Sequence, residues 1–509
     1  MHRRRDERVD TLTEQFRAGE ISRRHFIGGL LGLGLSVGSA GSLLAACSSS
    51  KGSSSASAAS TTSATTGVKA VQGHVQILVG FGTGNTPAQI PVQQALADAF
   101  TKLHPGVTID FLRIPSSNDA KTKLTVLIAG GTPPDLIMPM GLYGTSLFVD
   151  QNVFLDLGDL IKRDGLALDG FVPVTADAIR VPNYYGTSST AAIGLPVGVH
   201  VHALAYNAGL LQKAGVTPPP SSWDDATWTY DKFAQLASML TVDGKGRRPG
   251  DAGFDAKSVK QFGAGHFFRE TIFLGYGGKY YDPATKQAQL GTDASIKGIQ
   301  FAADLVNKMH VQPSMTQTAA LGAGGGQGNE EQFLWRAGQL AMIDMCSCDI
   351  KSPFGTDVPF DFGAAAIPAG PARRFTFLNL DVGAITQASK NRDAAWEVLK
   401  FFAVDPANER KLSFDSYGAF PPLKINNDAF VQGIKSSLPK TDPAVWQAGF
   451  PSASPDNEAW FPAFSEVNTL VGKTFDSIVD GAAADQAMPK LQTDAQAKID
   501  EWFTTHKLP

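Results

Sequence analysis

After residue 73, the spacing of apolar residues alternates between a pattern typical of strands and a pattern typical of helices. Short runs and every-second-position patterns predict strands, because side chains on a strand point alternately to opposite faces. Val92, Leu96 and Phe100 instead recur at helical spacing and fall on one face of a helix. The pattern predicts strand 74–81, helix 92–103, strand 107–114, helix 119–129 and strand 136–140.

Alternating strands and helices with short connections predict an α/β fold built on a parallel sheet with crossover helices. In such sheets ligands bind beyond the carboxyl ends of the strands. The rest of the chain continues with both element types and shows no internal repeat. It predicts a β-rich segment at 193–207, helices within 221–240, 294–309 and 392–403, a short helix after the glycine-rich loop 321–329, and two amphipathic helices in the last 45 residues.

The front of the chain has the order of features of an export signal. Arg23 and Arg24 precede an apolar stretch at 26–46 that is rich in glycine, and this stretch ends in Leu-Ala-Ala before Cys47. The Ser-Arg-Arg-His-Phe-Ile segment resembles a twin-arginine motif, and Leu-Ala-Ala-Cys resembles a bacterial lipobox. We therefore predict that residues 1–46 form a twin-arginine lipoprotein signal and that Cys47 is lipidated. The alternative is an uncleaved N-terminal anchor.

Residues 48–66 consist almost wholly of Ser, Ala and Thr. Such a segment buries too little apolar surface to offset its chain entropy, so we expect 47–72 to act as a flexible tether. Both readings of the leader place the remaining chain outside the cytoplasm.

Charge and cysteine content narrow the function classes. Without the seven Arg and five acidic residues of the leader, the mature chain has 37 basic and 43 acidic residues, a net charge of −6. This balance argues against a nucleic-acid partner, which favours a basic face. Cys346 and Cys348 are predicted to be unpaired and buried on or near a strand, because a disulfide across one residue is strained in most geometries.

Motifs that carry catalysis or cofactors are missing. The sequence contains no G-x-S-x-G elbow and no H-E-x-x-H helix, and neither glycine-rich segment matches a phosphate loop. His200 and His202 would share one face of a strand, but nothing in the sequence identifies a third or fourth metal ligand. We expect no cofactor and no metal site.

Several segments in order resemble the extracellular solute-binding proteins of ABC importers, in the group that carries sugars and other polar solutes. The resemblance covers nearly everything after Val71. Its landmarks are FTKLHPGVTID (100–110), KLTVLIAGGTPPDLIM (123–138), the segment 195–225 with its Leu-Pro and Tyr-Asn pairs, RAGQLAM (336–342), DFGAAAIPAGP (361–371) and KNRDAAWEVLKFF (390–402).

The resemblance implies a two-lobed periplasmic binding protein-like fold of type II, with a ligand cleft between the lobes. The implied lobe 1 comprises 73–197 and 380–418, and lobe 2 comprises 198–379 and 419–509. The implied protein is a monomer that hands its solute to membrane permease subunits.

Thirteen residues are candidates for ligand contact, because they follow strands, lie on the implied crossing strands or lie in loops that would reach the cleft. Hydroxyls of a sugar can bond to Asp, Asn and His, and its apolar ring faces can stack on aromatics. The candidates are Phe81, Thr83, Asn85, Met140, Tyr143, His200, His202, Tyr276, Lys279, Asp349, Asn379, Asp381 and Phe420.

The leading interpretation is a membrane-anchored binding protein that captures a sugar or oligosaccharide and performs no catalysis. Two alternatives stay open. One is an exported polysaccharide-processing enzyme, which would need a pair of carboxylates in the cleft and would change its ligand chemically. The other is a sensor subunit that presents its closed form to a signalling partner.

Replacing Cys47 by alanine tests the predicted anchor. The Cys47→Ala protein should move from the membrane fraction to the soluble fraction, because the lipid would have no thiol to join. Fractionation of cells followed by immunoblotting measures this. A variant that still partitions wholly with membranes would show that the anchor lies elsewhere.

Overall fold

The computed structural model describes residues 71–141, 148–149, 151–182, 190–265, 269–325, 330–438, 440–455 and 460–506. The leader and most of the predicted tether lie outside these residues. Within the described part of the chain, no helix has the length and apolarity needed to cross a bilayer.

Within the described residues, the strands form one large mixed sheet and three small two-stranded sheets. In the large sheet the order is β11-β6-β13-β3-β1-β2, with β12 also paired to β6 and β14 to β13. The bounds of its strands are β1 Gly73–Val79, β2 Val107–Arg113, β3 Leu136–Gly141, β6 Leu195–Asn207, β11 Met342–Cys346, β12 Phe362–Ala365, β13 Thr376–Ile385 and β14 Ala453–Ser454. The small sheets pair β4 Arg180–Pro182 with β5 Thr190–Ala192, β7 Val242–Asp243 with β8 Val259–Gln261, and β9 Tyr281–Asp282 with β10 Gln287–Ala288.

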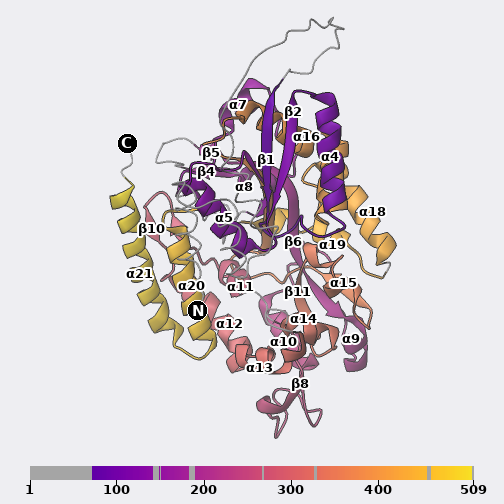
Figure 1. Ribbon diagram of the computed structural model, residues 1–509. Coiled ribbons are helices and arrows are strands. Elements are labelled where there is room, and N and C mark those ends of the chain that lie inside the picture. Colours follow the sequence, from indigo (N-terminus) through magenta and orange to yellow (C-terminus); the bar gives the residue numbers. More distant parts are fainter. Residues whose placement is uncertain are drawn as a thin grey trace, which may run out of the picture. The chain divides into compact units, whose positions relative to one another are not determined.

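The α-helices connect and cover these strands (Figure 1). Their bounds are α4 Ile90–Leu103, α5 Ser117–Ala129, α7 Gly158–Arg163, α8 Pro173–Ala178, α9 Ala208–Ala214, α10 Tyr230–Leu240, α11 Arg269–Gly275, α12 Asp293–Asn307, α13 Met315–Leu321, α14 Glu330–Arg336, α15 Pro353–Thr356, α16 Arg392–Ala403, α17 Pro406–Arg410, α18 Asn427–Ser437, α19 Ala444–Gln447, α20 Phe464–Val479 and α21 Ala484–Thr505.

The predicted parallel core is confirmed. β1 pairs in parallel with both β2 and β3, and α4 and α5 make the crossovers. Phe100 of α4 and Trp396 of α16 pack in one apolar cluster with alternate residues of β1, while Leu124 of α5 packs with Leu78 on the opposite face. Helices therefore cover both faces of these strands (Figure 1).

Side-chain caps set several helix starts. Ser116 accepts a hydrogen bond from the Asp119 backbone N–H at the start of α5, as N-cap residues do. The helix predicted within 221–240 begins only at Tyr230, because Thr229 and not the preceding Ser or Asp residues provides its cap.

β6 and β13 are long antiparallel neighbours that connect the strands β1–β3 with the strands β11 and β12. The C-terminal half of β13 pairs with β3, whereas β6 continues past β13 to pair with β11 and β12. Along β6, Val197 packs in the cluster around β1, and Val199 packs in the separate large cluster that includes α10–α12 and α20. The two crossing strands thus join two apolar cores.

Asp135 connects the start of β3 to two other segments. It is 8% exposed, and its Oδ2 accepts a hydrogen bond from the Gln76 N–H at 3.0 Å. Its Oδ1 accepts from the Ser389 hydroxyl at 2.6 Å and from the Asn391 amide at 3.2 Å. Asp135 therefore holds the turn before β3 against β1 and the segment that precedes α16.

Asp135→Ala is expected to lower the free energy of unfolding by about 3 kcal/mol or more, because three donors lose a charged acceptor in a buried setting. Urea denaturation measures the loss. Asp98→Ala, on the exposed face of α4, is the matched control and should change stability by less than about 0.5 kcal/mol. Equal stabilities for the two variants would contradict this role of Asp135.

Candidate functional site

One face of the sheet gathers polar side chains from three adjacent strands. Residues directly opposite each other on paired strands point to the same face. Asn379 of β13 lies opposite His200 of β6, and Cys346 of β11 lies opposite His202. Asp381 lies opposite Gly198 one step further along β6. We call Asp344, Cys346, His200, His202, Asn379 and Asp381 the polar face.

A hydrogen-bond chain crosses the polar face. The His202 Nδ1 lies 2.8 Å from the Asp344 Oδ1, and its Nε2 lies 3.0 Å from the amide nitrogen of Asn379. A carboxylate only accepts and an amide nitrogen only donates, so a neutral His202 carries its proton on Nδ1. The Asn379 side-chain oxygen is not used in this bond.

His200 is buried beside this chain. Its ring is 7% exposed, with Nδ1 3.4 Å from the Ser347 hydroxyl and Nε2 3.9 Å from the Asp381 Oδ2. Burial lowers the pKa of His200 to about 3, with a further lowering from His202. The imidazole is therefore neutral near pH 7.

Two carboxyl groups near the histidines hold protons unusually well. Burial raises the pKa of Asp381 to about 7. Burial also raises the pKa of Asp349 to about 6, against the opposing effect of His202. The ion pairs of Asp344 and Asp381 found in the described chain involve only histidine.

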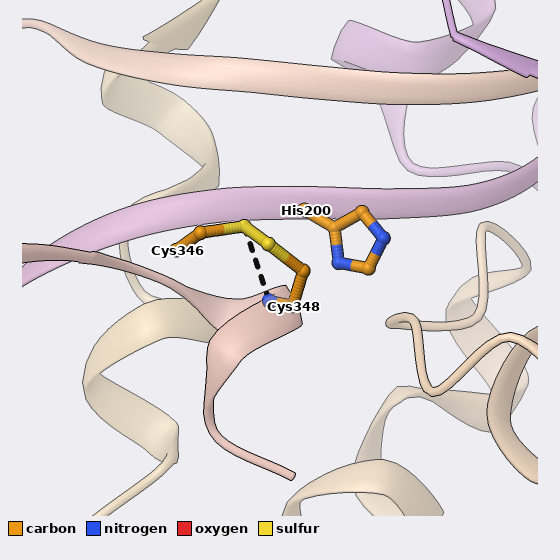
Figure 2. A group of neighbouring side chains, drawn as sticks. All are labelled: His200, Cys346 and Cys348. Carbon is orange, nitrogen blue, oxygen red and sulfur yellow. Dashed lines mark hydrogen bonds between the residues drawn. A yellow bond between two sulfur atoms is a disulfide. The ribbon is translucent and has the colours of Figure 1, made fainter. Parts of the chain in front are cut away.

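The structure corrects the prediction for the two cysteines. Cys346 and Cys348 form a disulfide, with their Cα atoms 5.1 Å apart (Figure 2). β11 ends at Cys346, and residues Ser347–Asp349 turn in a single 3-10 helix. This turn brings the two Cα atoms closer together than the roughly 6.6 Å of an extended strand, well inside the usual disulfide range.

The candidates at the ends of β1 and β3 lie together. Phe81 forms a β-bridge with Met140 and makes an edge contact with Phe148, and both Phe81 and Met140 are buried. The Thr83 hydroxyl lies 2.6 Å from the Gln89 side-chain nitrogen and accepts its hydrogen bond. The Asn85 amide donates to the carbonyls of Val79 and Ile114, so it closes the loop. Tyr143 lies outside the described residues.

The other three candidates have different surroundings. Tyr276 stacks on Tyr230 and lies tilted against Phe301 in an aromatic cluster. Lys279 is exposed. Phe420 is fully buried, packs on Phe430 with ring centroids 3.7 Å apart, and forms a bridge with Val199 of β6.

Sequence reasoning missed Asp344 of the polar face, Ser347 and Tyr417 next to it, and Trp460 elsewhere in the fold. Asp344 could have been found, because a carboxylate inside the apolar run AMIDMC needs a buried partner. Ser347, Tyr417 and Trp460 gave no such signal. The buried Tyr417 hydroxyl lies within electrostatic reach of Asp381, and half-buried Trp460 packs against both the large cluster and the α5 cluster.

The family model for bacterial extracellular solute-binding proteins matches residues 85–409, which is more than half of the chain. This chain belongs to that family. The members of the family are binding proteins rather than enzymes.

Similar proteins agree with this family and with the expected type II fold. A maltotriose-binding protein of Pyrococcus abyssi is 24% identical over 364 residues, which cover 69% of each chain. A solved ABC substrate-binding protein of Listeria monocytogenes, in complex with cycloalternan, is 18% identical with a TM-score of 0.64 and covers 84% of this chain and 99% of its own. A Mycobacterium tuberculosis protein in complex with glycerophosphocholine is 17% identical, with a TM-score of 0.62 and the same coverage.

Asp381→Asn should stabilise this solute-binding protein at neutral and alkaline pH. The raised pKa means that folded Asp381 keeps a proton that the unfolded chain loses from about pH 4, so native stability falls as pH rises toward about 7. Asparagine has no such proton to lose. The gain in unfolding free energy should therefore grow through this window and reach about 3–4 kcal/mol above it.

Urea denaturation of both proteins at about pH 4.5, 6 and 8 measures the difference. His200 contributes the opposite trend, since its lowered pKa costs stability in acid, but this contribution is common to both proteins. Asp98→Asn is the exposed control and should show no such pH dependence. A stability gain that is constant with pH would contradict the buried, protonated state of Asp381.

Proposed function

We propose that this protein is the extracytoplasmic binding component of an ABC import system and captures a sugar or oligosaccharide between two lobes. The observation that carries the proposal is the polar face, in which Asp344, His202 and Asn379 form a hydrogen-bonded chain on the strands that join two apolar cores. Lobe closure on the ligand would exclude water and strengthen these bonds.

The charges of the polar face favour a neutral polyol over an anion. Asp344, Asp349 and Asp381 lie close enough to the two histidines to interact with them electrostatically. A phosphate group placed beside these carboxyls would be repelled, whereas sugar hydroxyls can donate to carboxylates and accept from protonated carboxyls. The maltotriose-binding relative and the cycloalternan complex support the same ligand class.

The ligand-binding residues that we propose include every candidate from the sequence, together with Asp344 and Trp460. The polar face would provide the hydrogen bonds, and Phe81 and Met140 would shape the opposite wall from the ends of β1 and β3. Trp460 would offer an apolar surface, because it packs against the large cluster and the α5 cluster and is only partly buried.

The proposal also includes the route and the partners expected from the sequence. The chain would leave the cytoplasm by the twin-arginine route, stay attached to the outer face of the membrane through lipid on Cys47, and act as a monomer that delivers solute to permease subunits. The change of apolar cluster along β6 between Val197 and Val199 supports a lobe boundary near residue 198.

A thermal-shift screen of the mature protein tests the ligand class. Maltotriose, a cyclic oligosaccharide, glucose and glycerophosphocholine would be compared at matched concentrations. A ligand that binds only the native state at 100 times its Kd adds about 2.7 kcal/mol of stability, so at least one sugar should raise Tm clearly. The sugar assignment fails if no sugar shifts Tm while another solute class does.

Asn379→Ala then tests the site with whichever sugar binds. Removing this amide should weaken affinity about tenfold, the value of one good hydrogen bond to a ligand or its partner, as measured by calorimetry. Asp98→Ala should leave the affinity unchanged. Equal affinities for wild type and Asn379→Ala would place the ligand away from the polar face.

A further inference from the structure

The Cys346–Cys348 pair lies directly beside His200, at the point where β11 ends (Figure 2). The two Sγ atoms and an imidazole nitrogen of His200 lie within 4.8 Å of one another. His202 is not part of this group, because its two nitrogens already bond to Asp344 and Asn379. The sequence identifies no further metal ligands for the histidines. In the structure, the two cysteine sulfurs at the end of β11 lie beside His200 and are candidates for this role.

The imidazole of His200 is poorly satisfied by its other neighbours. Among the described residues, its side-chain polar contacts are at 3.4 Å to the Ser347 hydroxyl and 3.9 Å to Asp381, which are long for hydrogen bonds. A buried polar ring normally has closer partners. One ring nitrogen can therefore turn to a ligand without breaking a strong bond.

The sulfurs can coordinate an ion only after the disulfide is reduced. A dithiol reductant supplies two electrons and two protons: it becomes a disulfide itself, and the Cys346–Cys348 bond becomes two thiols. Cys348 is exposed, so a reductant and an ion can both reach it. Binding of a divalent ion then releases the thiol protons to solvent and leaves two thiolates and one imidazole as ligands.

We propose that Cys346, Cys348 and His200 form a binding site for a thiophilic metal ion of the Zn²⁺ class, which the disulfide closes and reduction opens. Two sulfurs and one imidazole nitrogen are a ligand set that suits zinc. Donors around a tetrahedral ion lie about 3.5–4 Å apart, so the two sulfurs must separate from bonding distance after reduction, whereas the His200 nitrogen already lies within 4.8 Å of both. Water or the Asp381 carboxylate can fill the fourth position.

The site would thus have two states, a disulfide in oxidising surroundings and a metal chelate in reducing ones. Disulfides persist outside the cytoplasm, whereas the cytoplasm keeps thiols reduced. A chain that folds before export, as the twin-arginine leader predicts, would pass through both environments. This inference does not depend on which solute the protein carries.

Cobalt binding to the full chain tests the site, in a Cys47→Ala background that removes the third thiol. After reduction and removal of the reductant under nitrogen, Co²⁺ should bind once per chain with the near-ultraviolet absorption of a thiolate complex, and one Zn²⁺ should displace it. The oxidised protein should bind none at the same concentrations. Absence of this absorption in the reduced protein would overturn the proposal.

Variants and the metal's own spectrum identify the ligands. Cys348→Ser, at an exposed position, and His200→Gln should each lower Zn²⁺ affinity more than about tenfold, while His74→Gln, an exposed histidine elsewhere, should not. X-ray absorption at the zinc edge should show two sulfur ligands and an imidazole, whether or not His200→Gln folds. A site with two sulfurs and no imidazole, or one unaffected by Cys348→Ser, would overturn the proposal.

Discussion

The antiparallel pairing of β6 with β13 is the constraint on which the rest of the structure depends. β6 leaves the parallel core and ends in the second apolar cluster, and β13 begins in that cluster and ends beside β3, so the two strands carry the chain between two cores in opposite directions. Their register also decides which side chains meet. A shift of one residue would turn His200, His202 and Asn379 away from one another, because strand side chains alternate between faces.

Burial gives these side chains their chemical character. An imidazole and a carboxyl group taken out of water both favour their neutral forms, which explains why the pKa of His200 falls and that of Asp381 rises. The two groups can then donate or accept hydrogen bonds without a net charge. A neutral, hydrogen-bonding surface suits the hydroxyl-rich solute that we propose.

Local pattern alone was enough to predict most elements of the first core. The helical spacing of Leu96 and Phe100 and the Pro-Asp turn before β3 are set within a few residues of chain. The ends of elements and the burial of single residues were less predictable. Helix α10 begins at Tyr230 because Thr229 caps it. Leu103, at the end of α4, is 58% exposed although it lies at helical spacing from the buried apolar residues of that helix. Helix caps and side-chain burial depend on how distant segments pack together, and the spacing of apolar residues along the chain does not specify this packing.

The sequence by itself determined the α/β class, the order of the elements, the family and the alternation that puts His200 and His202 on one face. Only the tertiary structure decided their partners. Asp344 and Cys346 meet them from β11, more than a hundred residues away, and a one-residue turn brings Cys348 back to Cys346. Strand register depends on contacts between segments that are distant in the sequence. The free energy that selects it comes from packing in both apolar cores, and no short segment determines it alone.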